Sequence, residues 1–328
     1  MDPLNPDSFN HRFATVNSTT IHYVDEGTGP VILCFHGFPD LWYGWRKQIP
    51  YLVSLGYRVI APDTHGYGQT DAPKDLKAYG AKNIVNDFVS LLDTLNIREA
   101  VWAGHDWGGL VAWRAALWHP ERVIGVISYC TPYIPTADTF TPLEDFVVKF
   151  PNWSYQLYFQ RPEATDELNK EIPLFLTALF RHYKDFAKTS IFNPAVPPEQ
   201  RTITDVRGLE RSSVFTQRQL DYYIGEFQRK GMEGPLNAYR VRKINWEDEH
   251  EAGFLMNKID KPSMMVTAGH DGALPAKWTE HMPNFIPDLM QEHVEESGHW
   301  ILDEQPEFCN SAFAKFLKHL EDSGHVKK

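Results

Sequence analysis

Residues 100–109 have the sequence AVWAGHDWGG, a short apolar run followed by an aspartate, Asp106, among glycines. Apolar residues at helical spacing follow in 110–123, so the segment predicts a strand, a sharp turn and a helix. A reactive residue framed by small residues at such a turn is typical of a nucleophile elbow, where serine is usual. The turn lifts its central side chain above the sheet toward the helix N-terminus, which favours negative charge. The pattern therefore predicts an ionised carboxylate in the place of a nucleophile.

Continuous apolar runs recur on both sides of this turn, and helix-like segments separate most of them. Such runs suit strands buried on both faces, and their alternation with helices indicates a mostly parallel central sheet flanked by helices. The runs are VILCFHG (31–37), YRVIAPD (57–63), RVIGVISYC (122–130), KPSMMVTAGHDG (261–272) and DLMQEHVEESGHW (288–300). Other predicted elements are an antiparallel lead-in at 11–17 and 20–27 and helices at 42–55, 83–96 and 305–320. We therefore expect an α/β fold of the doubly wound kind.

The alternation of strands and helices stops between about residues 131 and 246. This segment is rich in aromatic residues, proline and charge, and it predicts several short helices without a buried strand. We interpret it as an inserted helical cap. The chain then divides into a core of 1–133 and 248–328 and a cap of 134–247. Because ligands bind at the carboxyl edge of such sheets, the cap is expected to cover the site as a lid.

The composition excludes several classes of protein. The 328 residues carry a net charge of −11, which argues against nucleic acid or an anionic membrane as a partner. Three widely spaced cysteines imply no disulfide framework. The first residues lack the pattern of a secretory signal, and no apolar run approaches the roughly 20 residues of a membrane span. We expect a cytoplasmic protein, and a homodimer remains open.

Two residues late in the chain can complete a catalytic set with Asp106. After an elbow, an acid and then a histidine are expected at later strand ends. Asp271 follows one predicted strand, and His299 follows the next, beside a glycine. Asp138, in the loop after an earlier strand, is the rival for the acid. The order Asp106, Asp271, His299 predicts a nucleophile, a supporting acid and a base.

A further motif, HGFPD (36–40), follows the first buried strand of the core. The loop can turn backbone N–H groups toward the elbow and so form part of an oxyanion hole. One donor in this architecture is the N–H after the nucleophile, which is that of Trp107. The other comes from the early loop, and we expect the N–H of Phe38.

The choice of aspartate constrains the substrate. A carboxylate attacking an ester or amide would give an anhydride, a poor intermediate, whereas attack on a saturated carbon gives an ordinary alkyl ester. Water activated by His299 can then hydrolyse that ester at the carbonyl of Asp106. The electrophile is therefore expected to be an epoxide or a carbon bearing a halide. The histidines show no metal-ligand spacing such as H-E-x-x-H, so no metal and no cofactor are expected.

Two stretches of the predicted cap bear on the choice between these electrophiles. WSYQLYFQRP (153–162) and GPLNAYRVRKINW (234–246) each offer a tyrosine to the site. A phenol has an ordinary pKa near 10, so it is protonated at neutral pH and can donate to the alkoxide of an opening epoxide.

With HGFPDLWYGWRKQI, YGQTDAP, GHDWGG and SGHW, these cap stretches make the chain resemble the soluble epoxide hydrolases of the α/β-hydrolase superfamily. The resemblance runs from about Ile21 to Leu317. It implies an α/β-hydrolase fold with a cap, and a small apolar epoxide and water as substrates. It also implies that Tyr155, or less favourably Tyr158, holds the epoxide oxygen together with Tyr239. The implied substrate contacts are His36, Pro39, Trp107 and Trp300.

Two alternatives use the same scaffold. A haloalkane or haloacid dehalogenase would share the aspartate nucleophile, and the indole of Trp107 could hold the departing halide. A fluoroacetate-type enzyme would want an arginine after the nucleophile, where Trp107 stands. A non-catalytic receptor for a small apolar molecule would usually keep a serine triad. Incubation with styrene oxide and with 1-chlorobutane separates the three readings by release of diol, halide or neither.

Overall fold

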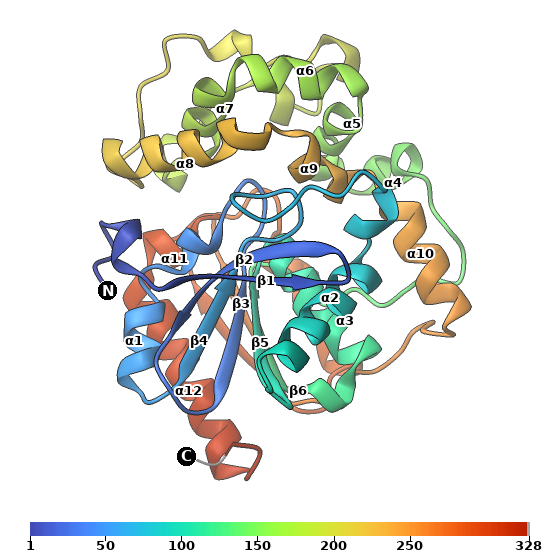
Figure 1. Ribbon diagram of the computed structural model, residues 1–328. Helices are drawn as coiled ribbons and strands as arrows, with labels where there is room; N and C mark the ends of the chain where they lie inside the picture. The colour runs from blue at the N-terminus through green and yellow to red at the C-terminus, as the bar shows by residue number, and fades with distance from the viewer. Residues whose placement is uncertain (327–328) are drawn as a thin grey trace.

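One mixed sheet of eight strands forms the centre of the molecule (Figure 1). The structure is a computed structural model that describes residues 1–326. The strand order is β1-β2-β4-β3-β5-β6-β7-β8, and only β2 runs antiparallel to its neighbours. The strands are β1 (His11–Val16), β2 (Thr19–Glu26), β3 (Val31–Phe35), β4 (Arg58–Pro62), β5 (Ala100–His105), β6 (Val123–Tyr129), β7 (Ser263–Ala268) and β8 (Leu289–Val294). The predicted α/β fold with a mostly parallel sheet is confirmed.

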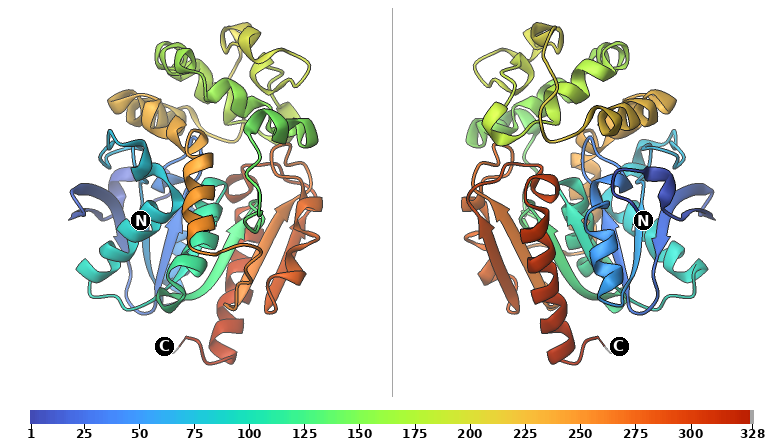
Figure 2. Two further views of the ribbon diagram at one scale, coloured as in Figure 1. Left: turned by 90° about the vertical axis from the view of Figure 1, so that its right-hand side faces the viewer. Right: turned by 90° about the vertical axis from the view of Figure 1, so that its left-hand side faces the viewer.

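Helices cover both faces of the sheet and create two apolar cores. Alternate residues of β5 face opposite sides, so Val101 and Ala103 join one core while Trp102 joins the other. Helices α1 and α12 cover the first face, and α2 and α3 cover the second (Figures 1 and 2). The core helices are α1 (Ile49–Ser54), α2 (Ala81–Thr94), α3 (Trp107–Trp118), α10 (Arg242–Glu251), α11 (Ile301–Glu304) and α12 (Pro306–Asp322). Within residues 1–326, no helix combines the length and apolarity needed to span a bilayer.

A layer of short helices lies over the carboxyl ends of the parallel strands (Figure 2). Its buried side chains, among them Phe159, Phe175 and Tyr223, belong to the same apolar cluster as one face of the sheet. The layer contains α4 (Leu143–Lys149), α5 (Tyr155–Phe159), α6 (Pro162–Lys170), α7 (Ile172–Leu179), α8 (Gln217–Lys230) and α9 (Glu233–Leu236). The expected boundary at residue 247 falls inside α10, which packs against α2 and joins this layer to the core.

The structure corrects one predicted element. The segment 42–55 is two short helices rather than one, a 3-10 helix at Trp42–Trp45 followed by α1 at Ile49–Ser54. Pro50 lies in the first turn of α1. Proline has no N–H to donate and its ring clashes with the carbonyl four residues before it, so a continuous helix through Pro50 is disfavoured. A new helix can start there because first-turn N–H groups need no partner in the helix.

The strand order places two loops side by side at the carboxyl edge of the sheet. The chain leaves β3 toward β4 on one side and returns to β5 on the other, and β3 pairs directly with β5. The loop after β3 and the turn after β5 therefore meet at the point where the winding of the sheet reverses. This is the point at which open α/β sheets bind ligands.

Candidate active site

Asp106 occupies a strained turn between β5 and α3. Its backbone has φ 52° and ψ −123°, and it is not a glycine. The turn is tight because the backbone of α3 approaches β3 closely. A Cβ on Gly108 would lie 2.1 Å from the carbonyl oxygen of Phe35, and a Cβ on Gly37 would lie 2.4 Å from the Asp106 side chain. Glycines on both sides thus allow the carboxylate to stand in the turn.

Two backbone N–H groups hold the carboxylate of Asp106. The N–H of Phe38 donates to Oδ1 over 2.8 Å, and the N–H of Trp107 donates to the same carboxylate. Burial raises the pKa of Asp106, although these two hydrogen bonds and nearby His299 act to lower it. The two donors predicted for an oxyanion hole thus lie beside the predicted nucleophile. They can stabilise negative charge on an oxygen of this carboxyl group.

His299 stands between two carboxylates. Its Nε2 lies 3.7 Å from Oδ2 of Asp106, and its Nδ1 donates to Oδ2 of Asp271 over 2.8 Å. Burial alone would lower the pKa of His299, but the charge and hydrogen bond of Asp271, together with the charges of Asp106 and Glu304, raise that pKa to about 9. Burial alone would raise the pKa of Asp271, but the charge of His299 and the hydrogen bonds from His299 and the backbone of Leu274 together lower it to about 2. Asp138, the rival acid, is exposed.

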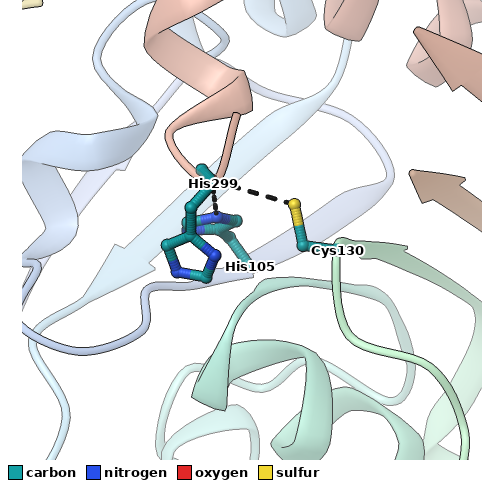
Figure 3. A group of neighbouring side chains, drawn as sticks. All are labelled: His105, Cys130 and His299. Atoms are coloured by element: carbon teal, nitrogen blue, oxygen red, sulfur yellow. Dashed lines mark hydrogen bonds between the residues drawn. The ribbon is translucent and has the colours of Figure 1, made fainter. Parts of the chain in front are cut away.

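The backbone that carries His299 is supported from beneath by two side chains (Figure 3). Nε2 of His105 donates to the carbonyl oxygen of His299 over 2.7 Å, since a carbonyl can only accept. Sγ of Cys130 contacts the same oxygen at 3.7 Å. Burial, with a further contribution from the charge of His299, lowers the pKa of His105 to about 3, so this ring is neutral. Neither supporting residue could be predicted from the sequence, because each contacts the backbone of a segment that is distant in sequence.

The same three side chains also have the donor types of a metal site. Within residues 1–326, His105, Cys130 and His299 are a group whose ligand atoms lie within 4.8 Å of one another. The contacts of His105 and Cys130 with the His299 carbonyl account for their positions without an ion.

The cap brings two tyrosines toward Asp106. Tyr155, at the start of α5, and Tyr239, in a 3-10 helix before α10, both line the cavity that contains Asp106. Burial raises the pKa of both phenols, and the charge of Asp106 adds to the effect, so both are protonated. The ring of Tyr239 meets that of Trp107 edge-on at 5.1 Å. Tyr158, the alternative to Tyr155, is buried and lies outside the cavity lining.

The cavity has a volume of about 280 Å³ and is lined mainly by apolar and aromatic side chains. Trp107 belongs to its lining, whereas His36, Pro39 and Trp300 do not. Both ring nitrogens of His36 are engaged in the core, one with the carbonyl of Gly37 and one with the N–H of Thr64. The indole N–H of Trp300 donates to a cap carbonyl over 2.7 Å. The position of a residue in a sequence motif therefore does not determine whether its side chain points into the cavity.

Three charged residues of the cavity were not identified from the sequence. Arg114 of α3 and Glu249 of α10 form a buried ion pair, with Nε–Oε1 and Nη2–Oε2 distances of 2.7 and 3.1 Å. Arg242, at the start of α10, is the third. No local signal marks them, because α10 approaches α3 only in the folded chain.

Comparison with known proteins assigns this chain to a family. A family model described as alpha/beta hydrolase fold matches residues 30–306. Bifunctional epoxide hydrolase 2 of Rattus norvegicus is 36% identical over 318 residues, which cover 96% of this chain and 57% of the rat protein. Epoxide hydrolase A of Mycobacterium tuberculosis is 35% identical over 318 residues, covering 94% of this chain and 98% of that protein. The chain thus spans about half the length of the rat relative and nearly all of the mycobacterial one.

Solved structures of similar proteins superpose on nearly the whole of this chain. Epoxide Hydrolase A from Mycobacterium thermoresistibile superposes with a TM-score of 0.83 at 33% identity, covering 94% of this chain and 98% of that one. An epoxide hydrolase from an endophytic Streptomyces gives a TM-score of 0.84 at 29% identity, covering 96% of each chain. The agreement extends across core and cap.

Proposed function

Because the chain belongs to the α/β-hydrolase fold family, we propose that it opens epoxides to vicinal diols through a covalent ester on Asp106. The observation that carries the proposal is a buried aspartate in the elbow, with its carboxylate between two N–H donors and the imidazole of His299. A carboxylate nucleophile suits a saturated carbon, for the chemical reason given above. The names of the similar proteins support an epoxide as the electrophile.

In the first step, a carboxylate oxygen of Asp106 forms a bond to one ring carbon of the epoxide. The bond from that carbon to the epoxide oxygen breaks, and its electron pair goes to the oxygen. The phenols of Tyr155 and Tyr239 donate hydrogen bonds to this developing alkoxide, and one of them supplies the proton. Both phenols are buried and protonated, which supports this role.

In the second step, Nε2 of His299 takes a proton from water, and the resulting hydroxide attacks the ester carbonyl of Asp106. The N–H groups of Phe38 and Trp107 hold the oxyanion of the tetrahedral intermediate. When the ester bond breaks, the leaving oxygen takes the proton from His299 and departs as the diol. The proton of the carboxyl group regenerated at Asp106 returns through solvent to the phenolate formed in the first step. Alkylation itself prepares the base. An ester at Asp106 carries no charge, so one of the carboxylates that raise the pKa of His299 is lost at the moment that a base is needed.

Isotope transfer tests the covalent step. In a single turnover in H₂¹⁸O with enzyme in excess, the label should enter the carboxyl group of Asp106 and the first diol should be unlabelled. Mass spectrometry of the peptide that contains Asp106 and of the diol measures both. Label in the diol of the first turnover, with none in Asp106, would show direct attack by water and contradict the proposal.

A matched pair of variants tests the nucleophile. Asp106→Ala should lower kcat/KM for styrene oxide by about 10⁴-fold or more, as removal of a nucleophile does elsewhere. Asp138→Ala changes an exposed aspartate outside the cavity lining and should keep the wild-type rate. Halide release from 1-chlorobutane without diol from styrene oxide would instead identify a dehalogenase.

A further inference from the structure

Glu304 is a buried carboxylate beside the loop of the base, and the proposed mechanism does not use it. It lies in α11, shortly after His299, and its side chain is 0% exposed. Oε2 accepts the N–H of Gly298 over 3.1 Å and the N–H of Tyr183 over 3.5 Å. Within residues 1–326, Oε1 has no hydrogen-bond partner. Burial of a carboxylate is costly unless the group is well paired, so a carboxylate kept here with few partners points to a function beyond packing.

The cap meets the loop of the base at this carboxylate. His182 and Tyr183 belong to the cap segment that follows α7. Nδ1 of His182 accepts a backbone N–H, so the hydrogen of the neutral ring is on Nε2, which lies 3.7 Å from Oε2 of Glu304. A Cβ on Gly298 would lie 2.8 Å from Cβ of Tyr183 and 3.0 Å from Oε1 of Glu304. The cap, α11 and the loop of the base thus converge on Gly298, the residue before His299.

Tyr183 makes two further contacts between the cap and the catalytic loops. Its ring stacks on that of His270 with 4.5 Å between centroids, and His270 directly precedes Asp271. Its hydroxyl donates to the carboxylate of Glu296, which lies in the same loop as His299. One residue of the cap therefore holds both the loop of the supporting acid and the loop of the base.

The charge of Glu304 also acts on the imidazole of His299. The titratable groups that face His299 are Asp106, Asp271, Glu304 and neutral His105, and those that face Glu304 are His182 and His299. Burial raises the pKa of Glu304, while the N–H of Gly298 and the imidazole of His182 act to lower it. Ester formation removes the charge of Asp106. Glu304 and Asp271 then remain to stabilise the imidazolium that forms when His299 takes a proton from water.

We propose that Glu304 is a positioning residue for the base, and that it ties the loop of His299 to the cap through Tyr183 and His182. The inference rests on the proposed function and adds a residue that acts in its second step. Through the N–H of Gly298, Glu304 fixes the backbone that carries the imidazole, and its charge supports that imidazole during proton transfer. Attack on the epoxide needs no proton transfer to His299, so ester hydrolysis depends on Glu304 and ester formation does not.

Glu304→Gln tests the role of the charge, because the amide oxygen can still accept the N–H of Gly298. Stopped-flow fluorescence with styrene oxide measures ester formation, and single-turnover release of diol at a series of pH values measures ester hydrolysis. Ester formation should stay within about twofold of wild type. The plateau rate of hydrolysis should fall by about threefold or more, and the midpoint of its pH profile should move about 0.5 pH unit or more toward lower pH.

The shift of the midpoint separates this role from a loss of packing, which lowers the plateau without moving the midpoint. Removal of a negative charge near His299 makes the imidazolium less stable, so the midpoint can only move toward lower pH. A midpoint that does not move, or ester formation slowed as much as hydrolysis, would overturn the proposal.

Glu296→Gln is the matched control. It makes the same change of charge in the same loop, but the side chain of Glu296 is 68% exposed, so solvent screens its charge. Both steps should keep the wild-type rate within about twofold, and the midpoint should stay in place. If Glu296→Gln moves the midpoint as far as Glu304→Gln does, the effect does not belong to the buried carboxylate and the proposal fails.

A double-mutant cycle tests the tie to the cap. His182→Phe keeps a ring at a partly exposed position and removes the nitrogen that faces Glu304. It should slow ester hydrolysis by about twofold or more, and it should add almost nothing in the Glu304→Gln background. Additive effects would refute the tie. If Glu304→Gln does not fold, His182→Phe alone decides, and hydrolysis at the wild-type rate would then count against the proposal.

The two proposals fail in different ways. If wild-type enzyme forms no ester at Asp106 with styrene oxide, the proposed function is wrong. If the ester forms and is hydrolysed, and Glu304→Gln keeps the wild-type pH profile, the function stands and the role of Glu304 is wrong.

Discussion

At the scale of single residues, three protonated or charged groups surround the carboxylate of Asp106 and divide the work between them. The imidazole of His299 faces one oxygen, while the phenols of Tyr155 and Tyr239 approach from the cap. Because the phenols are far less acidic than the imidazolium, they can donate to an alkoxide without losing their protons in the resting enzyme. Each group can therefore be tested by removing one hydrogen-bonding atom.

Removal of the phenolic oxygens should slow epoxide opening. Tyr155→Phe and Tyr239→Phe should each lower the rate of ester formation, and the double variant should lower it by about 10²-fold or more. Stopped-flow quenching of tryptophan fluorescence by substrate measures this step. Tyr158→Phe is the matched control, because Tyr158 lies outside the cavity lining, and it should alkylate at the wild-type rate. A double variant that keeps the full rate would exclude the phenols.

The His299–Asp271 pair predicts a pH window for stability. The pKa of His299 is raised to about 9, so its contribution is fully present below its unfolded value of about 6.5 and is lost as pH rises through about 9. The pKa of Asp271 is lowered to about 2, so its contribution is present above about 4 and is lost as pH falls through about 2. The free energy of unfolding lost in His299→Gln should therefore be larger near pH 6 than near pH 9.5.

Urea unfolding of wild type, His299→Gln, Asp271→Asn and the double variant at both pH values measures this dependence. In the Asp271→Asn background, the effect of His299→Gln should lose most of its pH dependence, since the two residues form one unit. The same pH dependence in both backgrounds would show that Asp271 is not its source.

At the scale of elements, the site depends on how closely α3 packs against β3. Gly108→Ala would place its Cβ 2.1 Å from a backbone oxygen, where no rotamer change can relieve the clash. We expect the free energy of unfolding to fall by about 2 kcal/mol or more and epoxide turnover to fall with it. Gly225→Ala, at an exposed position of α8, meets no atom within 4 Å and should raise the free energy of unfolding by about 0.5–1 kcal/mol. Denaturant unfolding of both variants checks this, and equal effects would contradict the packing argument.

The sequence predicted the elements whose signals are local. Strands such as β5 are continuous apolar runs, and the order of Asp106, Asp271 and His299 follows from the order of the strands that precede them. The sequence could not predict the direction in which a side chain points where that direction depends on contacts with segments distant in sequence. Arg242, His105 and the choice of Tyr155 over Tyr158 are decided by where α5, α10 and β8 lie in space. The helix predicted at 42–55 is two shorter helices, because Pro50 disfavours a continuous helix through that position.

At the scale of the whole molecule, polar contacts as well as apolar packing fasten the cap to the core. The hydroxyl of Tyr223 in α8 donates to Oδ1 of Asp40 in the loop after β3 over 2.7 Å. Nearby, the indole N–H of Trp42 donates to the hydroxyl of Tyr222 over 3.0 Å. Asp40 lies two residues after Phe38 in the same loop, and the N–H of Phe38 donates to Asp106. The junction is therefore connected to the oxyanion hole through only two residues of chain.

The contribution of this junction to stability should change as pH passes through neutrality. Burial raises the pKa of Asp40 to about 7, so its contribution to stability is fully present below its unfolded pKa of about 4 and is lost as pH rises through about 7. Asp40→Asn keeps the acceptor for Tyr223 and does not ionise. The free energy of unfolding of Asp40→Asn, relative to that of wild type, should therefore increase from about pH 5 to about pH 8. Unfolding curves across this range test the prediction, and parallel profiles would contradict it.

The division of the core around the cap has a consequence for synthesis on the ribosome. His105 and His299, which touch through a hydrogen bond, are 194 residues apart, and the whole cap is translated between them. Until β7 and β8 emerge, β6 has an open edge with unpaired backbone groups, which is the kind of surface that aggregates. A nascent chain would thus carry its nucleophile long before its base, and the edge of β6 would stay open while the whole cap is synthesised.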